Sequence, residues 1–154
     1  MGHNNLSWWG NNTWNWGDQL NPWLYSKITG IPVSKINRIE LGDKTNTPRY
    51  YVIGSILNHM HSPNVEVWGS GLEGSNFPIP HLPSKLNAVR GPLTRKVLIS
   101  LGCDCPEIYG DPALLLPKYY TPNVKKEYKY GVVQHFLHKQ ETAWVSKYKN
   151  DPTV

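Results

Sequence analysis

The apolar residues of the chain form short β-rich runs separated by stretches with helical spacing, and glycine or proline marks most of the changes. The β-rich runs predict strands at Leu6–Trp9, Val33–Ile39, Tyr51–Ile53 and Val65–Trp68. The last two runs have little polar alternation, which is typical of strands buried on both faces of a parallel sheet. Strands that alternate with helices predict an α/β fold, a Rossmann-like parallel sheet flanked by helices.

Two segments carry the spacing of amphipathic helices. The first should begin with Asp18 as its N-cap, hold Pro22 in its first turn and end at Gly30. The second should begin with Pro92, because the first helical position does not need an N–H, and end at Gly102. The apolar positions are Leu20, Trp23, Leu24 and Ile28 in the first segment and Leu93, Val97, Leu98 and Leu101 in the second.

Three further segments complete the predicted first domain. Residues 73–87 hold three prolines and no periodicity, so we expect a loop there. Glu107–Tyr109 predicts a short strand, and the Gly-Asp-Pro that follows it predicts a helix start capped by Asp111. Residues 1–117 should therefore form one Rossmann-like N-terminal domain.

The rest of the chain predicts the beginning of a second domain. Residues 118–127 are polar and basic, as in a linker, and Tyr128–Phe136 predicts a strand followed by a helix. Two elements cannot close a core of their own. Residues 128–154 would therefore either add to the first sheet or be the first strand and helix of an incomplete second domain, in a fragment of a longer chain.

Composition and charge narrow the classes of partner. The 154 residues, 39% of them hydrophobic, suit a globular domain rather than a disordered chain. The net charge of +5 is spread without a continuous basic stripe, which argues against a nucleic acid. It favours an anionic small molecule, or a weak attraction to acidic headgroups at a membrane surface.

Cysteine and histidine spacing argues against a metal site. Cys103 and Cys105 are too close for a relaxed disulfide and lack partners at zinc spacing, so we expect free thiols in a reducing compartment. His59 and His61, at i and i+2, are poorly placed to share a metal. Neither a signal peptide nor an apolar run of membrane-spanning length is visible, so we expect a soluble cytoplasmic protein without a transmembrane segment.

Polar residues and glycines follow the predicted strands at their carboxyl ends, where ligands bind in open α/β sheets. Asn15, Gly17 and Asp18 follow the first strand, and a plain helix cap is the alternative for Asp18. Ser55 and Ser70 each follow a glycine at the end of a strand. Glycine there lets a ligand approach the backbone, and serine supplies a donor or an acceptor.

A second group of candidates lies where a later strand meets a helix. Arg90, Gly91 and Thr94 combine a cation, the free amides of a first helical turn and a hydroxyl, which together favour an anion. A surface arginine on an ordinary loop is the alternative. His59 follows the first Gly-Ser and can act as an acid or base near neutral pH, whereas a surface position is favoured for His61.

Five short motifs occur in order along the chain. They are N-W-G-D-x-L-N-P-x-L at Asn15–Leu24, I-G-S-I-L at Ile53–Leu57, V-W-G-S-G-L at Val67–Leu72, V-R-G-P-L-T-R at Val89–Arg95 and G-D-P-A-L-L-L-P at Gly110–Pro117. Together they resemble the polysaccharide pyruvyl transferase family, over nearly the whole chain. G-V-V-Q-H at Gly131–His135 is similar to the family's G-V-V-P-H, with glutamine in place of proline.

The resemblance implies two Rossmann-like domains facing each other across a cleft, as in GT-B glycosyltransferases, with this chain carrying the first half. It also implies a transferase that moves a pyruvyl group from phosphoenolpyruvate to a hexose of a polysaccharide or glycan. The product is a ketal, and phosphate is released. Phosphoenolpyruvate is then the donor substrate, no separate cofactor is needed, and the acceptor is a saccharide, free or lipid-linked.

This chemistry assigns roles to the candidate residues. The donor's phosphate and carboxylate need cationic and amide partners, which Arg90, Gly91 and Thr94 would supply. His59 and Asp18 are the candidates for protonating the methylene carbon and deprotonating the sugar hydroxyl, in either order. The remaining candidates for substrate binding are Asn15, Gly17, Ser55, Ser70 and His135.

Two other functions stay open, because the family's later Ser-Arg-Leu-His motif does not occur in these 154 residues. One is a truncated, non-catalytic module that holds a glycan through its tryptophans, whose flat rings match the C–H face of a pyranose. The other is a GT-B-like glycosyltransferase that uses a nucleotide sugar, since a fold does not fix its chemistry.

Overall fold

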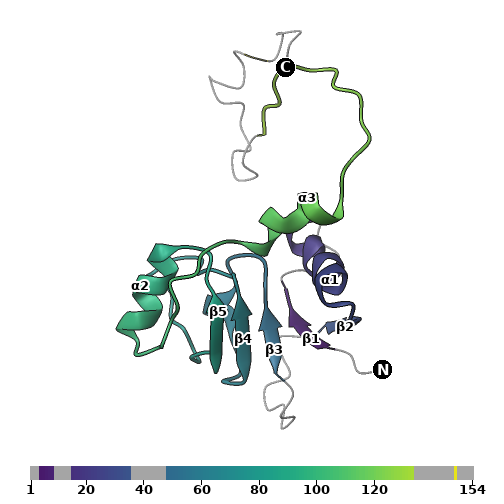
Figure 1. Cartoon of the computed structure of the whole chain (residues 1–154). Coiled ribbons are helices and arrows are strands. Elements are labelled where there is room, and N and C mark those ends of the chain that lie inside the picture. The colour runs from purple at the N-terminus through teal and green to yellow at the C-terminus, as the bar shows by residue number, and fades with distance from the viewer. Residues whose placement is uncertain (1–3, 9–14, 36–47, 134–147, 149–154) are drawn as a thin grey trace. The chain divides into compact units, whose positions relative to one another are not determined.

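The computed structural model describes residues 4–8, 15–35, 48–133 and 148. By its internal contacts the chain divides into two compact units, Met1–Tyr120 and Thr121–Val154. All of the labelled helices and strands in Figure 1 belong to the first unit. The first unit therefore holds the candidate site, apart from His135, which lies outside the described residues.

Five strands form one sheet in the first unit. They are β1 (Asn4–Ser7), β2 (Val33–Lys35), β3 (Arg49–Tyr51), β4 (Val65–Trp68) and β5 (Lys85–Ala88). The order is β2-β1-β3-β4-β5, and every neighbouring pair is parallel (Figure 1). The prediction of an α/β fold with a parallel sheet flanked by helices is confirmed at that level. This strand order is doubly wound and changes direction between β1 and β3, where such sheets bind ligands.

Helix α1 (Trp16–Thr29) begins one turn earlier than the sequence pattern indicated. The Asn15 side chain is the N-cap, because its oxygen accepts hydrogen bonds from the amides of Gly17 and Asp18 at 3.1 and 3.4 Å. The prediction that Asp18 caps this helix is therefore wrong, and Asp18 is instead buried in the first turn. Pro22 accordingly lies inside the helix rather than in its first turn. Gly30 ends the helix in the left-handed region, as predicted.

Helix α2 (Pro92–Ser100) begins and ends as its proline and glycine indicated. Gly91 is the extended N-cap residue, and Gly102 follows the helix at a φ of 88°. The apolar face is narrower than predicted, because Leu98 is buried whereas Leu93 is 80% exposed. Short helices complete the first unit: η1 (Leu57–His59), η2 (Pro112–Leu115) and α3 (Leu116–Tyr119), with Asp111 capping η2 as predicted.

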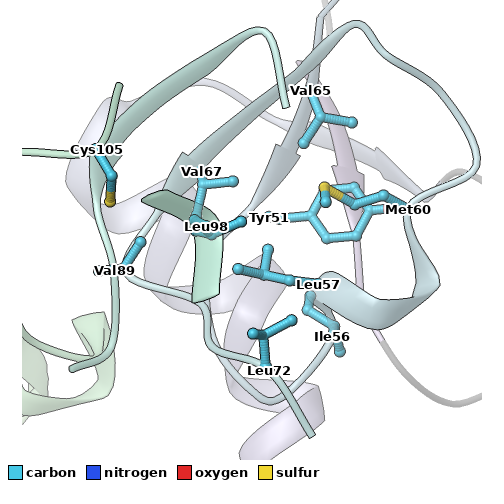
Figure 2. Packing of buried hydrophobic residues seen from close by; sticks show 10 residues of the cluster. All are labelled: Tyr51, Ile56, Leu57, Met60, Val65, Val67, Leu72, Val89, Leu98 and Cys105. Atoms are coloured by element: carbon cyan, nitrogen blue, oxygen red, sulfur yellow. The ribbon is translucent and has the colours of Figure 1, made fainter. Parts of the chain in front are cut away.

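The core lies in two clusters on opposite faces of the sheet, because successive strand residues point in opposite directions. On one face Leu20, Leu24 and Tyr25 of α1 pack against Leu6 and neighbouring residues of the sheet. On the other face Leu98 of α2 joins a larger cluster, whose side chains point toward one another in Figure 2. That cluster comprises Tyr51, Ile56, Leu57, Met60, Val65, Val67, Leu72, Val89, Leu98 and Cys105.

Two other segments differ from their predictions. The first three residues of β5 belong to residues 73–87, which were predicted to be a loop. They form a strand, although β5 has no β-branched residue, because they pair with β4. Glu107–Tyr109 contributes one bridge, from Tyr109 to Val89, rather than a full strand.

The second unit departs from the strand predicted at Tyr128–Phe136. Its described residues 121–133 are exposed and form neither a helix nor a strand. A strand needs a partner for its backbone groups, and within these described residues none is paired. The remainder of the predicted strand and most of the helix after it lie outside the described residues.

The side chain of Asn21 joins α1 by hydrogen bonds to the backbone that follows β3. It is fully buried, its oxygen accepts from the amide of Ile53 at 2.8 Å, and its amide donates to the carbonyls of Ile53 and Asp18. An Asn21→Ala variant should lose about 2 kcal/mol of unfolding free energy in urea denaturation, because the Ile53 amide and the carbonyls of Ile53 and Asp18 lose a hydrogen-bond partner. Gln19→Ala, on the exposed side of the same helix, should change it by less than about 0.5 kcal/mol. Equal effects of the two substitutions would contradict this role for Asn21.

Candidate functional site

Arg90 joins three of the motif segments at the carboxyl edge of the sheet. Its Nη1 donates to Ser55 Oγ after β3 at 2.6 Å, and its Nη2 donates to the carbonyl of Leu72 after β4 at 3.0 Å. Its own amide donates to the carbonyl of Ser70 at 3.1 Å. The guanidinium is thereby held in one orientation while the residue stays exposed. A fixed, exposed guanidinium with further N–H donors is well suited to bind a carboxylate or phosphate.

Gly71 makes room for this arginine. A Cβ atom on Gly71 would lie only 2.7 Å from Arg90 Nε and 2.8 Å from its Cζ, so any larger residue would displace the guanidinium. The backbone around it is cross-linked, because the Gly71 amide donates to Gly54 and its carbonyl accepts from Leu57. Glycine is therefore needed at position 71, because the Arg90 side chain lies directly against the backbone there.

A cavity of about 800 Å³ opens between Arg90 and the first turns of α2. Arg90, Gly91 and Thr94, three residues chosen from the sequence, line it together with Lys96. Thr94 itself is buried, and its hydroxyl accepts from the amide of Leu72 at 3.4 Å, so it supports the cavity wall. The full lining is Leu72, Glu73, Gly74, Ser75, Arg90, Gly91, Pro92, Leu93, Thr94, Lys96, Val97 and Ser100.

Asp18 lies at the reversal point of the sheet, at the start of α1. Its carboxylate approaches Gly54, the residue before Ser55, since a Cβ on Gly54 would lie 3.9 Å from Asp18 Oδ1. Asn15 holds the start of this helix in place, because its side-chain oxygen accepts hydrogen bonds from the amides of Gly17 and Asp18. Asp18 is thus near the β3 end that also carries the serine bonded to Arg90.

His59 lies at the end of η1 and pairs with a carboxylate that the sequence did not single out. Its Nε2 is 3.3 Å from Glu73 Oε2, which is an ion pair when the imidazole is protonated. Asn58 positions the Glu73 segment, because its side chain accepts from the Glu73 amide at 2.7 Å and donates to the carbonyls of Gly74 and Phe77. His59 and Glu73 therefore lie together beside the cavity, which Glu73 lines.

Ser70 occupies a different environment from Ser55. It is fully buried, and its hydroxyl has no hydrogen-bond partner within the described residues. Its contact with the site is instead through its backbone carbonyl, which accepts from Arg90. Ser55 therefore contacts Arg90 through its hydroxyl, whereas Ser70 contacts Arg90 through its backbone carbonyl.

The structure brings most of the predicted residues to one edge of the sheet in two neighbouring groups. Arg90, Gly91, Thr94 and Ser55 form one group, and Asn15, Gly17 and Asp18 form the other at the start of α1. Four polar residues of this region were not predicted from the sequence. Asn21 alone lies within one of the five motifs, and neither periodicity nor a motif distinguishes the other three from surface residues. These four are Asn21, Asn58, Glu73 and Lys96.

The cysteines do not belong to this site. Both are free thiols, as predicted, and burial raises the pKa of Cys103 and of Cys105 above the usual thiol value. A thiol with a raised pKa stays protonated at neutral pH and is a poor nucleophile. Over the described residues, no group of three His, Cys, Asp or Glu side chains is placed to hold a metal ion.

Comparison of the chain with protein-family models, with curated proteins and with solved structures finds no match. The resemblance to the pyruvyl transferases therefore rests on the five motifs alone. Among the helices of the described residues, none is long and apolar enough to cross a bilayer.

Proposed function

We propose that the chain belongs to a transferase that moves the pyruvyl group of phosphoenolpyruvate onto a hexose of a polysaccharide or glycan. Two hydroxyls of the hexose add to C2 of the donor and lose their protons. C3 gains one of these protons and becomes a methyl group, and the C2–O bond to phosphate breaks, so that the phosphate leaves with the other proton. The products are a pyruvate ketal and inorganic phosphate, so atoms and charge balance without a cofactor. The acceptor is a free or lipid-linked saccharide.

The observation that carries this proposal is the arrangement of Arg90. Three motif segments that are separate in the sequence, around Ser55, around Leu72 and around Arg90 itself, meet through the hydrogen bonds of one guanidinium. Arg90 and Lys96 give the adjoining cavity two cationic side chains. A donor that carries both a phosphate and a carboxylate needs such a combination of fixed and mobile positive charge.

Protonation of the methylene carbon and deprotonation of the sugar hydroxyls fall to groups at the same edge. His59, whose Nε2 lies 3.3 Å from Glu73 Oε2, is the first candidate, because an imidazole can give or take a proton and its partner Glu73 lines the cavity. Asp18 is the second candidate, near Gly54 on the β3 end. In this assignment His59 acts as the acid and Asp18 as the base toward the acceptor.

The proposal places the chain in the first half of a GT-B-like protein, with the acceptor entering from the side of a second domain. Residues 118–127 would link the two domains, and His135 would act from the second. The proposal includes a cytoplasmic location. The net charge of +5 favours approach to a lipid-linked acceptor at an acidic membrane surface.

The test is incubation of the protein with phosphoenolpyruvate labelled with ¹³C at C3 and with a panel of glycans. We expect phosphate release in step with a new methyl carbon signal from the ketal. Release of phosphate without a ketal, or no reaction with any acceptor, would contradict the proposal. Sugar binding without a response to the donor would instead identify a glycan-binding module, and turnover of a nucleotide sugar would identify a glycosyltransferase.

A further inference from the structure

An aromatic groove lies on the outer side of α1, away from the Arg90 cavity. Trp16 and Trp23 are seven residues apart on one face of the helix, and Tyr120 follows α3 and faces them. The groove has a volume of about 370 Å³ and is lined by Trp16, Gln19, Leu20, Trp23, Leu116 and Tyr120. All of these residues belong to the first unit of the chain.

Its three aromatic side chains are unusually open to solvent. Trp16 is 67% exposed, Tyr120 is 55% exposed and Trp23 is 37% exposed. The rings of Trp23 and Tyr120 stand nearly perpendicular, at 88°, with their centroids 6.5 Å apart, so they form two walls rather than a stack. Exposed tryptophans in contact with a hollow lose apolar hydration when a ligand covers them, which favours binding.

The chemistry of the lining selects among ligand classes. No residue that lines the groove carries a charge, in contrast to the cavity at Arg90, although the Lys27 ammonium lies 5.7 Å from the centroid of the Trp23 ring. The hydrogen-bonding side-chain groups of the lining residues are the Gln19 amide, the two indole N–H groups and the Tyr120 hydroxyl. Flat apolar rings combined with neutral polar groups fit a pyranose, which presents C–H bonds on one face and hydroxyls around its edge.

We propose that this groove binds one pyranose residue of a glycan. Its volume is at the lower end of the range for small-molecule sites, about 300–1,000 Å³, which suits a single sugar ring better than an oligosaccharide. Trp16 is two residues before Asp18, which is buried on the other side of the helix start. A glycan passing over the start of α1 therefore reaches the sheet edge with one residue while another is held in the groove.

Assignment of this glycan as the acceptor rests on the proposed function, but sugar binding itself does not. The two are separated by titrating the full chain with sugars in the absence of phosphoenolpyruvate. The chain has seven tryptophans, and each indole N–H gives its own signal in a ¹H–¹⁵N NMR spectrum, assigned by single Trp→Phe variants. The probes are the methyl glycosides of glucose, galactose and mannose and the disaccharides cellobiose and lactose.

We expect the indole signals of Trp16 and Trp23 to shift with at least one of these sugars, while that of Trp68 in the core stays in place. Trp16→Ala should weaken the binding about tenfold, as expected for loss of a stacking surface. Trp16→Phe, which keeps a flat ring, should weaken it less. Phe77→Ala removes an exposed aromatic ring of the first unit that does not line the groove, and it should leave the affinity unchanged.

Three results would overturn the inference. The signals of Trp16 and Trp23 do not move with any of the five sugars, or the Trp23 signal moves at the same sugar concentrations in Trp16→Ala as in the unchanged protein, or cyclohexanol moves both signals while the sugars do not. The last result would identify a plain apolar site. Sugar binding with no phosphate release in the separate donor assay would retain this site and reject the proposed transfer reaction.

Discussion

An Arg90→Lys variant should bind phosphoenolpyruvate about 100-fold more weakly than the unchanged protein. Lysine keeps the positive charge but lacks the planar fork, so it cannot hold Ser55 and the Leu72 carbonyl and still present donors to an anion. Hydrogen bonds to charged groups contribute about 1.5–3 kcal/mol each, and one or two of them would be lost. Isothermal titration calorimetry with phosphoenolpyruvate measures the change directly.

Lys118→Gln is the matched control for charge. Lys118 is exposed on α3 and does not line the Arg90 cavity, so its replacement lowers the net charge at a distance from the site. The affinity for phosphoenolpyruvate should fall by less than about twofold, because salt screens the interaction between surface charges that are far apart. Equal losses in Arg90→Lys and Lys118→Gln would show that general charge, rather than the fixed guanidinium, governs donor binding.

A Gly69→Ala variant should lose about 3–5 kcal/mol of unfolding free energy. Gly69 has a φ of 110°, which strains any other residue, and a Cβ there would lie 2.5 Å from Pro112 Cδ and would also clash with the carbonyl of Gly110. Neither neighbour is the end of a flexible side chain, so the end of β4 and the start of η2 would have to separate. Urea denaturation followed by circular dichroism measures the loss.

Gly131→Ala provides the comparison for this stability effect. Gly131 is exposed in the second unit, does not have a positive φ, and would place its Cβ in open space. Its replacement should change stability by less than about 0.5 kcal/mol. A Gly69→Ala protein as stable as Gly131→Ala would mean that β4 and η2 are not packed as closely as the structure has them.

Much of the local structure was predictable because single residues determine it. Gly30 and Gly102 mark the ends of helices, and Pro92 marks the start of one, through backbone preferences that need no tertiary contact. The start of α1 was harder, because Asn15 and Asp18 are both good caps and lie within one turn of each other. β5 was missed because Lys85–Ala88 becomes a strand through pairing with β4 rather than through its own propensity.

The candidate site was likewise predictable only in part from the sequence. Arg90 and Ser55 were predicted to lie near each other, because the carboxyl ends of parallel strands share one edge of a sheet. Their direct hydrogen bond, and the space that Gly71 leaves for it, depend on strand register and side-chain rotamers that no local pattern encodes. The pairing of His59 with Glu73 likewise depends on the hydrogen bonds by which Asn58 holds the segment after β4 against η1.

The central claim is that the position of the Arg90 guanidinium makes this edge of the sheet a donor site. Gly71→Ala tests it most directly, because it retains every charge and donor but moves the guanidinium, at little cost to a flexible side chain. Calorimetric titration with phosphoenolpyruvate should show binding by the unchanged protein and at least tenfold weaker binding by Gly71→Ala, with similar urea midpoints for the two. Equal affinities, or no binding by the unchanged protein, would contradict the account.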